Sequence, residues 1–328
     1  MKQIDEVDAR ILTSLLTESR MSFTELAKTC DISVTAIIRR YNRLKRAGII
    51  LGESMHLNPL SVGYEIIAEI GITTDLPEKE KAVQMLGDKN VFRLTDSLGR
   101  YDIYGLVMAR NLDALEQLVE RIDIKPIVRS LDILIFADPW ENQWHPENIV
   151  INLSERENFV PSPRKARNRF ESVSVDKTDK RIAKMLMEDS RIAFKEIAER
   201  LKISSKNVIQ RYHSLREKGI LNLSTISLDI SKLGYKAILD AYLRVENRGN
   251  LQEVEAHLLR IPNSTFCAKF VGGAYDLRIA FIVADFNDVF RIKQQINSLR
   301  NIRAAEYYLH EVPGAWLDDF VGDSWRRL

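Results

Sequence analysis

The hydrophobic positions of residues 32–49 repeat with the period of a helix. Ile37, Tyr41 and Leu44 fall at i, i+4 and i+7, which predicts one apolar stripe along an amphipathic helix. Ser33 is suited to cap the start of this helix, and Gly48 is suited to end it in a left-handed turn. The opposite face is polar and contains no acidic side chain: Thr35, Arg39, Asn42, Arg43 and Arg46. A face of this kind indicates a polyanion as partner.

The same pattern occurs a second time, 171 positions further along the chain. Residues 203–220 match residues 32–49, and the match extends back without a gap to Asp8 and Asp179. Over this window about 17 of 43 positions are identical. A repeat of this length indicates that the chain consists of two homologous halves.

Two shorter helices are expected before the basic helix. We expect Asp8 to cap a first helix at 9–17, and Ser22 with Glu25 forms a capping-box pattern that opens a second helix ending near Thr29. A short helix, a tight turn and a longer basic helix make a helix-turn-helix. In the second half, the corresponding helices are expected at 180–186, 194–200 and 205–217.

After each basic helix the pattern changes to short apolar runs that alternate with amphipathic segments. In the first half a strand is expected at 49–57, followed by strand, helix, strand, strand, helix and strand at 64–73, 77–86, 91–98, 103–109, 112–122 and 127–136. The second half repeats the order at 235–245, 251–259, 265–271, 275–283, 286–299 and 302–310. This βαββαβ order predicts a ferredoxin-like plait with an antiparallel sheet and both helices on one face.

The patterns together predict an α+β protein in which two winged-type helix-turn-helix domains alternate with two βαββαβ domains. The expected domains are helix-turn-helix 1 at 1–58, plait 1 at 59–155, a basic linker at 156–175, helix-turn-helix 2 at 176–230 and plait 2 at 231–328. The linker is either a plain spacer or a basic arm that lies on phosphates or in a minor groove. Asp102 and Asp276 match at an offset of 174, so the second half contains three additional residues.

Composition is that of an ordinary globular protein, with 45% hydrophobic and 29% charged residues. The net charge is only +2, but both helix-turn-helix windows and the linker are basic, so the rest of the chain must be acidic. The two cysteines, Cys30 and Cys267, are expected to be buried, inert thiols. With no secretory or membrane-spanning segment in the sequence, we expect a reducing cytoplasm.

The motifs resemble those of the Lrp/AsnC (feast/famine) transcription regulators. The resemblance is carried by D-x-R-I-L from Asp8, S-R-x-S-F-x-E-L-A from Ser19, I-S-x-x-x-x-x-x-R-x-x-x-L-x-x-x-G-I from Ile32, and the G-x-Y-D turns that end at Asp102 and Asp276. It covers nearly the whole chain. Members of that family usually carry one copy, so this chain resembles the tandem form seen in some archaeal regulators. The resemblance implies an effector-binding plait that also mediates pairing.

Double-stranded DNA is the expected partner, and the N-terminal parts of the two basic helices are expected to read it. Arg40 and Arg211 lie at the edge of the apolar stripe in both halves, which favours phosphate or structural contacts. The two faces differ in sequence, which predicts two different half-sites. The candidate DNA-binding residues are Ser33, Thr35, Ala36, Arg39, Arg40, Asn42, Arg43 and Arg46 in the first half, and Ser204, Lys206, Asn207, Gln210, Arg211, His213 and Ser214 in the second.

For the plaits, the resemblance implies a small-molecule effector, often an amino acid, bound near the G-x-Y-D turn. Asp102 and Asp276 either hold the amino group of the effector or tie the turn through backbone N–H groups. The additional charge at Arg100 predicts that the two sites differ in ligand preference. The candidate effector residues are Gly99, Arg100, Tyr101, Asp102, Gly273, Tyr275 and Asp276. Through these plaits the chain is expected to self-associate, as an internal pseudo-dimer or as a homodimer.

Two other functions remain alternatives. Siroheme decarboxylases resemble the same architecture, so the fold alone permits an enzyme. The five histidines are scattered along the sequence, and no grouping of a nucleophile with a base is visible, so we expect no enzyme, no cofactor and no metal site. A metabolite sensor that does not bind DNA would be expected to have acidic residues within its basic faces. In the second helix only Glu217, near its end, interrupts that face.

Overall fold

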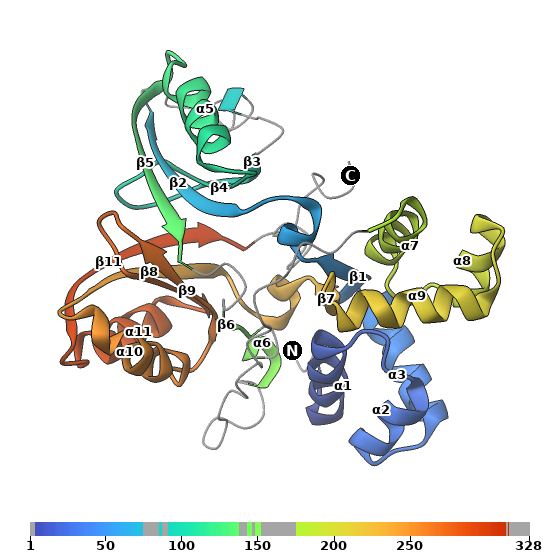
Figure 1. Ribbon diagram of the computed structural model, residues 1–328. Helices are drawn as coiled ribbons and strands as arrows, with labels where there is room; N and C mark the ends of the chain where they lie inside the picture. Colours follow the sequence, from blue (N-terminus) through green and yellow to red (C-terminus); the bar gives the residue numbers. More distant parts are fainter. Residues whose placement is uncertain are drawn as a thin grey trace. The chain divides into compact units, whose positions relative to one another are not determined.

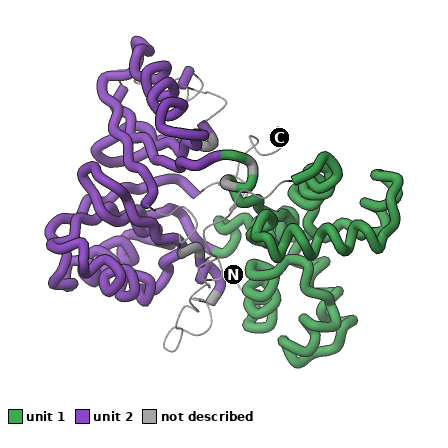
Figure 2. The backbone as a smooth tube through the Cα atoms, viewed as in Figure 1, with its two compact units in different colours: residues 1–63, 167–233, 314–328 green, residues 64–166, 234–313 purple. Residues whose placement is uncertain are grey.

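The structure is a computed structural model, and it describes residues 4–74, 85–86, 91–137, 143–145, 148–151, 175–312 and 314. The described chain divides into two compact units (Figures 1 and 2). Unit 1 takes the described residues within 1–63, 167–233 and 314–328, and unit 2 those within 64–166 and 234–313. Each unit therefore combines equivalent parts of both halves of the sequence. The division predicted from sequence into five consecutive segments stays a prediction.

Unit 1 contains the two helix-turn-helix motifs. The first comprises α1 (Glu6–Thr17), α2 (Phe23–Cys30) and α3 (Val34–Arg46). The second comprises α7 (Lys177–Glu188), α8 (Phe194–Leu201) and α9 (Ser205–Glu217). The predicted apolar stripe is confirmed, because Ile37, Tyr41 and Leu44 are the buried residues of α3.

The third helix of each motif, α3 or α9, is followed by a strand, and these two strands join the motifs. β1 (Ile50–Leu57) pairs antiparallel with β7 (Leu221–Leu228) in a two-stranded ladder. The short 3₁₀ helices Pro59–Val62 and Ile230–Leu233 follow them. Because β1 follows α3 and β7 follows α9, the pairing of the two strands links these two helices within one chain.

The predicted cap of the first helix is wrong by three residues. Asp5 caps α1 and shares a capping box with Asp8, which is the third residue of the helix. Asp8 is fully buried, and its carboxylate also accepts from Arg40 and Arg43 of α3. The tertiary contacts with two arginines therefore place Asp8 inside the helix, and the less buried Asp5 takes the cap. Asp176 caps α7 in the same way.

Unit 2 contains both plaits. Plait 1 has β2 (Ile66–Thr74), β3 (Val91–Asp96), β4 (Ile103–Ala109), α5 (Leu112–Asp123) and β5 (Val128–Phe136). Plait 2 has β8 (Ala237–Val245), α10 (Leu251–Leu259), β9 (Ser264–Val271), β10 (Leu277–Val283), α11 (Phe286–Asn297) and β11 (Ile302–Glu311). The short 3₁₀ helix Arg248–Asn250 precedes α10. The described strands have the order β5-β2-β4-β3 in plait 1 and β11-β8-β10-β9 in plait 2. This order is that of a ferredoxin-like plait, so the predicted α+β class is confirmed.

The two sheets join at both ends. β5 pairs with β9 through Ile135–Val271 and Phe136–Phe270, and Leu98 forms an isolated antiparallel bridge with Leu309. The short strand β6 (Gln143–Trp144) and helix α6 (Asn148–Ile151) lie against β9. The helices cover the outer faces, since Leu115, Leu118 and Ile122 of α5 share a core with β2 and β4. The inner faces of the two sheets are left to pack against each other.

The strand registers locate the three additional residues of the second half. Ile66 of β2 pairs with Ala109, whereas Ala237 of β8 pairs with Val283. The offset is therefore 237 − 66 = 171 for the first strands and 283 − 109 = 174 for the third strands. The insertion lies within plait 2, between β8 and β10. By these offsets Glu69 of β2 is equivalent to Asp240 of β8.

Two predicted segments fall mostly outside the described residues. Of the predicted helix at 77–86, only residues 85–86 are described, and they are helical. Of the predicted basic linker at 156–175, only residue 175 is described. Both stay predictions. The two cysteines are buried and free, as expected.

Candidate nucleic-acid interface and plait junction

The outward face of α3 presents its polar side chains to solvent. Ser33 caps the helix by accepting from the Ala36 amide at 3.2 Å. Arg39 is exposed and forms no ion pair among the described residues, whereas Arg43, also exposed, is bonded to Asp8. Thr35, Asn42 and Arg46 are also exposed. Of Arg39, Arg40 and Arg43, Arg39 is therefore the one without a carboxylate partner among the described residues.

Arg40 and Arg211 have equivalent structural partners. Arg40 Nη1 donates to Asp5 at 2.6 Å and to Asp8 at 2.9 Å. Arg211 Nη1 donates to Asp176 at 2.7 Å and to Asp179 at 2.6 Å. The carboxylates raise the pKa of each guanidinium, and each salt bridge ties the third helix of a motif to the start of its first helix. These are the structural contacts that the sequence allowed for, and a phosphate contact by either arginine stays a prediction.

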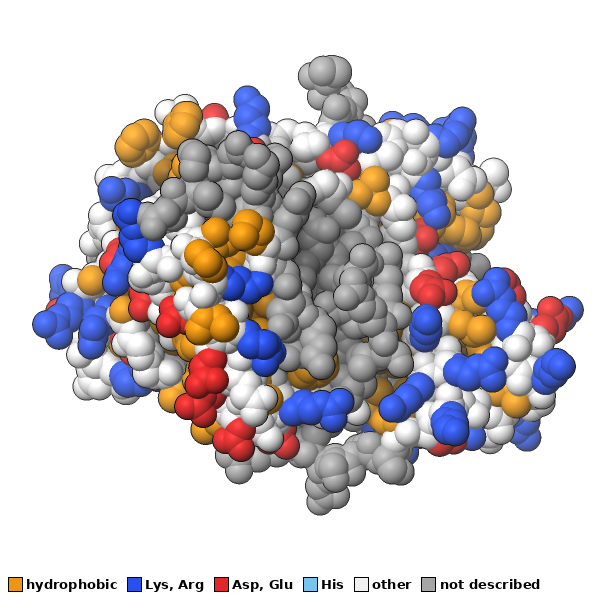
Figure 3. Space-filling view, turned by 90° about the horizontal axis from the view of Figure 1, so that it is seen from above, with side chains coloured by type: hydrophobic (Ala, Val, Ile, Leu, Met, Phe, Trp, Pro, Cys, Tyr) orange, Lys and Arg blue, Asp and Glu red, His pale blue; other side chains and the backbone are white. Residues whose placement is uncertain are grey.

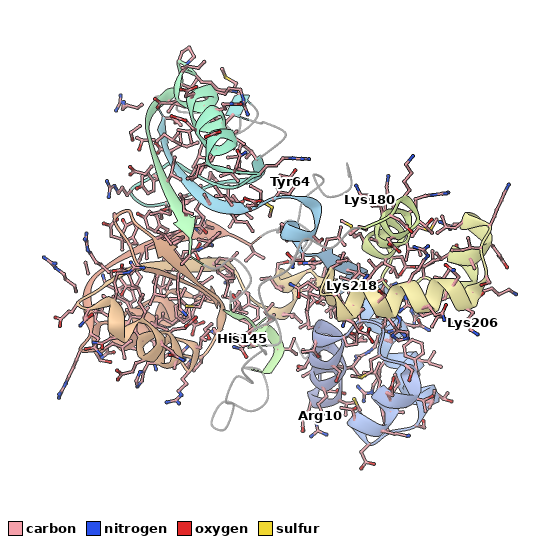
Figure 4. The ribbon with its side chains drawn as sticks, viewed as in Figure 1. Arg10, Tyr64, His145, Lys180, Lys206 and Lys218 are labelled. Carbon is pink, nitrogen blue, oxygen red and sulfur yellow. The ribbon has the colours of Figure 1, made fainter. Side chains whose placement is uncertain are left out.

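The face of α9 differs from that of α3. Ser204 caps the helix by accepting from the Asn207 amide, and the Asn207 side chain accepts from Arg211 at 2.8 Å. Lys206 lies near the start of α9, and Lys218 lies directly after its end (Figure 4). Gln210 is exposed at the position equivalent to Arg39. His213 is also exposed, and Ser214 is half-buried. The structure thus presents two different polar faces, as the sequence predicted.

The two motifs are held together by reciprocal arginines that the sequence analysis did not identify. Arg20 donates to the carbonyls of Ser190 and Ile192, and its guanidinium lies 4.2 Å from the Phe194 ring centroid. Its equivalent, Arg191, donates to Ser19 and Met21 and lies 4.8 Å from the Phe23 ring centroid. The Ser19 and Ser190 hydroxyls are bonded to each other at the centre. The repeated Ser-Arg pair in the sequence was the available signal.

Basic side chains are abundant on unit 1. Figure 3 shows Lys and Arg side chains on the face of unit 1 that carries α7 and α8, with a smaller number of acidic side chains between them. On α7, four basic residues are exposed at helical spacing: Lys177, Lys180, Arg181 and Lys184. The surface charge of the unit is therefore compatible with a polyanionic partner.

The predicted effector turns lie where the two plaits meet. A Cβ added at Gly99 would come within 2.1 Å of the Tyr308 ring, and one added at Gly273 within 2.9 Å of Leu134. Gly273 also has a φ of +77°. Tyr308 and Leu134 are equivalent positions on the two inner faces. The turn glycines therefore permit close contact between the plaits, a role that the sequence analysis did not consider.

The two turn aspartates bind backbone amides. Asp102 accepts from the Thr74 amide at 2.9 Å, and Asp276 accepts from the Val245 amide at 3.1 Å. Asp276 also forms an ion pair with Arg248. These contacts correspond to the alternative in which each aspartate ties the turn. That either aspartate binds an effector stays a prediction.

Arg100 and Tyr101, which precede Asp102 in the turn of plait 1, contact Asp132 of β5 and Tyr275 of plait 2. Tyr101 donates to Asp132, and Arg100 lies 3.6 Å from the same carboxylate and close to Tyr275. Burial raises the pKa of Tyr275. Arg100 is about half exposed, at 52% of its side chain, so its guanidinium can be reached from solvent.

A buried charged cluster lies between the inner faces of the two plaits. Arg278 binds Asp240 in a bidentate pair, with Nε–Oδ1 at 2.9 Å and Nη2–Oδ2 at 2.8 Å, and donates from Nη1 to Glu69. Tyr242 donates to Glu69 at 2.7 Å, and His310 Nε2 lies 3.0 Å from Asp240. We call these five residues the inter-plait cluster. The signal that sequence reasoning missed is a charge within an otherwise apolar strand.

Burial and the neighbouring charges act in opposite directions on the two carboxyls. For Asp240 burial disfavours the charged form, but Arg278 and His310 outweigh it and hold the pKa well below its usual range. For Glu69 burial dominates over Arg278, and its pKa is raised. The cluster therefore contains one firmly ionised carboxylate and one that is more easily protonated.

Two negative observations complete the description. Among the described residues, no helix is long and apolar enough to cross a membrane. In the same part of the chain, no group of three or more His, Cys, Asp or Glu side chains is arranged to hold a metal ion.

Comparison with known proteins relates both halves to one group of regulators. The model of the AsnC-type helix-turn-helix domain matches residues 4–45 and again residues 175–216. An uncharacterized HTH-type transcriptional regulator of Pyrococcus furiosus is 31% identical over 121 residues, which cover 37% of this chain and 82% of that protein. Regulatory protein AsnC of Escherichia coli is 32% identical over 137 residues, covering 40% and 89%. The match to each of these relatives covers less than one half of this chain.

A solved structure shares the arrangement of the whole chain and corrects one expectation. The siroheme decarboxylase NirDL superposes with a TM-score of 0.66 at 13% identity, covering 98% of this chain and 96% of that one. The expectation of no enzymatic activity is therefore wrong as an exclusion, because an enzyme has this same tandem fold. At this identity the likeness concerns the fold alone.

The sequence relatives, the two matched domains and the predicted motifs agree with one another. The chain belongs to the Lrp/AsnC family of helix-turn-helix transcription regulators, in a tandem form.

Proposed function

We propose that this protein is a sequence-specific double-stranded DNA-binding transcription regulator that reads two different half-sites with one chain. The observation that carries the proposal is the pair of exposed, unlike faces on α3 and α9, joined by the β1–β7 ladder. Its relatives are HTH-type transcriptional regulators, which supports DNA as the partner. Arg39 matches the fork of acceptors on guanine, whereas its equivalent, Gln210, matches adenine.

The test is selection of binding sites from random double-stranded DNA. Arg39→Ala is expected to relax one base position by about 1–3 kcal/mol and to leave the other half-site unchanged, and Gln210→Ala is expected to do the converse. Arg10→Ala is the control, because Arg10 is exposed on α1 and paired with Glu6. Selected sites that are perfect inverted repeats would contradict the proposal of unlike half-sites. No binding in low salt would contradict DNA binding itself.

For the effector, we propose an amino acid bound at the turn of plait 1. The support is Arg100, which is accessible, carries a positive charge and lies beside the junction with plait 2. An amino acid carboxylate is able to take the place of Asp132 as the partner of Arg100. Plait 2 has Ala274 in the equivalent turn, and the neighbouring cation, Arg248, is already paired with Asp276. Only the first site is therefore expected to bind a carboxylate strongly.

A thermal-shift screen with the twenty amino acids tests this site. At least one amino acid is expected to raise the unfolding temperature in a saturable manner, and Arg100→Ala is expected to abolish the shift. Arg303→Ala, a substitution of an exposed arginine on β11, is the control. If no amino acid shifts the unfolding temperature, or if Arg100→Ala leaves the shift unchanged, the effector proposal is wrong.

A second candidate function is a tetrapyrrole-binding decarboxylase, and one observation favours it. The full-length fold likeness is to a siroheme decarboxylase, which has also been solved with an iron-uroporphyrin III analogue. Titration with iron-uroporphyrin, followed by visible absorption, tests this candidate. A saturable shift of the absorption band at stoichiometric protein would support it, and an unchanged spectrum would remove it.

A further inference from the structure

We propose that the inter-plait cluster selects the pairing of plait 1 with plait 2 and disfavours pairing of either plait with a second copy of itself. The inference concerns the assembly and does not depend on DNA binding or on an effector. It rests on which half of the chain supplies each buried charge between the inner faces. The partner that this surface fits is the other half of the same sequence.

Each plait supplies one buried carboxylate, but among the described residues only plait 2 supplies the groups that donate hydrogen bonds to the Glu69 carboxylate. Glu69 belongs to plait 1 and Asp240 to plait 2, and they occupy equivalent positions on their strands. Both are almost completely buried, at 3% and 2% exposure. The Arg278 guanidinium and the Tyr242 hydroxyl, which donate to Glu69, both belong to plait 2. Plait 1 thus contributes a buried carboxylate and depends on plait 2 for the groups that satisfy it.

The residues of plait 1 that are equivalent to these donors cannot replace them. Tyr104 of plait 1 is equivalent to Arg278, because Tyr104 pairs with Gly71 as Arg278 pairs with Tyr242. Gly71 is therefore the counterpart of Tyr242. A tyrosine and a glycine provide no cation, and the glycine provides no side chain. At the position of His310, plait 1 has Phe136, which stacks on Phe270 of plait 2.

Pairing of two copies of plait 1 would bury two Glu69 carboxylates without a cation between them. Unpaired charges in an apolar interior are strongly unfavourable, and this is the penalty against the wrong partner. It would also lose the Tyr242 ring, which in the observed pair stacks on Tyr104 with ring centroids 5.4 Å apart. Like-with-like pairing of plait 1 is thus opposed by both charge and packing.

Pairing of two copies of plait 2 is opposed in a different way. Each Arg278 already binds its own Asp240 through Nε and Nη2. Across the junction, Nη1 would meet Asp240 of the second copy in place of Glu69, and this carboxylate is one methylene shorter and already bound by its own Arg278. The mixed pair is the arrangement in which these contacts are made.

The packing of the rings supports the same pairing. Tyr104 of plait 1 packs against both Tyr242 and Tyr308 of plait 2, with ring centroids 5.4 Å and 5.1 Å away. Leu134 of plait 1 is equivalent to Tyr308, so the two inner faces are unlike in size as well as in charge. Tyr308 of plait 2 lies against Gly99 of plait 1, whereas the smaller Leu134 of plait 1 lies against Gly273 of plait 2.

The test uses the full chain with a specific protease site introduced within residues 156–175. After cleavage of the folded protein, subunit exchange with isotope-labelled cleaved protein in moderate urea, followed by native mass spectrometry, counts the three types of pair. Random pairing would leave about half of the complexes mixed, and we expect a roughly tenfold or greater excess of mixed pairs over each like pair. Arg278→Gln is expected to remove this excess. Arg303→Gln, on the exposed face of β11, is expected to retain it.

A second measurement covers the case in which the cleaved fragments fail to exchange. The molar mass of the intact chain is measured by light scattering over a range of protein concentrations. Arg278→Gln is expected to shift the mass to higher multiples of the wild-type value, because plaits of different chains then compete with internal pairing. A statistical mixture of pairs in the exchange, or an intact Arg278→Gln protein with the wild-type mass at every concentration, would overturn the proposal.

Discussion

Replacement of Arg278 by methionine removes the only guanidinium that contacts both buried carboxylates of the inter-plait cluster in the described structure. Arg278 lies between Glu69 and Asp240, and only 14% of its side chain is exposed. Methionine preserves most of the aliphatic volume, so the change acts mainly on charge. We expect a large loss of stability in unit 2.

The magnitude follows from the burial of the partners. Removing one member of a buried ion pair costs roughly 3–5 kcal/mol, because the remaining charge stays in the interior. Here the remaining charges are Glu69 and Asp240, each almost completely buried. In urea, for a denaturant slope of about 3 kcal/mol per M, such a loss lowers the unfolding midpoint by roughly 1–2 M.

A matched triple variant separates charge from packing. In Glu69→Gln/Asp240→Asn/Arg278→Met no buried charge is left without a partner, and Tyr242 keeps an amide oxygen to which it can donate. The single variant loses stability mainly because two carboxylates stay buried without their cation, and the triple variant contains neither of these charges. The triple variant is therefore expected to regain most of the stability that the single variant loses.

The loss is expected to depend on pH. Without Arg278, the folded-state pKa values of both carboxyls rise above their unfolded values near 4. A carboxyl with a raised folded-state pKa supports folding at low pH and ceases to do so as the pH rises through that value. The deficit of Arg278→Met relative to the wild type should thus be small near pH 4 and larger at pH 7.

Urea unfolding followed by circular dichroism at pH 5 and pH 7 measures these quantities. Two results would refute the reasoning. One is a midpoint for Arg278→Met within about 0.3 M of the wild type at pH 7, since this corresponds to a loss of about 1 kcal/mol, well below the expected value of roughly 3–5 kcal/mol. The other is a triple variant that is no more stable than the single variant, because the loss would then arise from packing.

Three further predictions concern unit 1. Asp8→Asn should lower the free energy of unfolding by roughly 3 kcal/mol, because Asp8 is fully buried between two arginines. Asp179→Asn should lower it by about 1 kcal/mol, because Asp179 is partly exposed and binds one arginine. Equal losses in thermal unfolding would contradict this difference. Arg20→Ala and Arg191→Ala should each cost about 2 kcal/mol through the lost ring contact and charged hydrogen bonds, and a silent variant would argue against the reciprocal arrangement. Burial lowers the pKa of His56 to about 4. The contribution of neutral His56 to wild-type stability is therefore complete above about pH 6.5 and is lost as the pH falls toward 4. His56→Gln should lose less stability than the wild type between pH 7 and pH 5, and an equal loss would show that His56 is not the cause.

The repeat and its local signals predicted the helices of both motifs and the described strands and helices of both plaits, but not β6, β7 or α6. Ser22, Ser33 and Ser204 cap the helices for which they were expected to do so. The βαββαβ order predicted both plaits, because alternation between periods of two and 3.6 residues is a local property. The helix spanning 205–217 was predicted to the residue.

The sequence could not supply the contacts between the two halves. Nothing in the pattern around Arg20 shows that it crosses to Phe194, because that contact depends on the pairing of β1 with β7. For the same reason, the pattern of β2 does not show that Glu69 binds Arg278, because the two residues belong to different plaits. Asp5 caps α1 in place of Asp8, because the Asp8 carboxylate is bound by Arg40 and Arg43 of α3.

The β1–β7 ladder has a consequence for how the protein responds to its own abundance. Two separate chains that must meet before binding fall apart on dilution, so the amount of competent dimer declines with the square of the chain number. In this chain both strands of the ladder belong to one polypeptide, and tethering of this kind supplies an effective concentration on the order of millimolar. The proportion of paired motifs is then independent of copy number. Occupancy of a target should rise linearly with expression, even in a cell that contains only a few molecules.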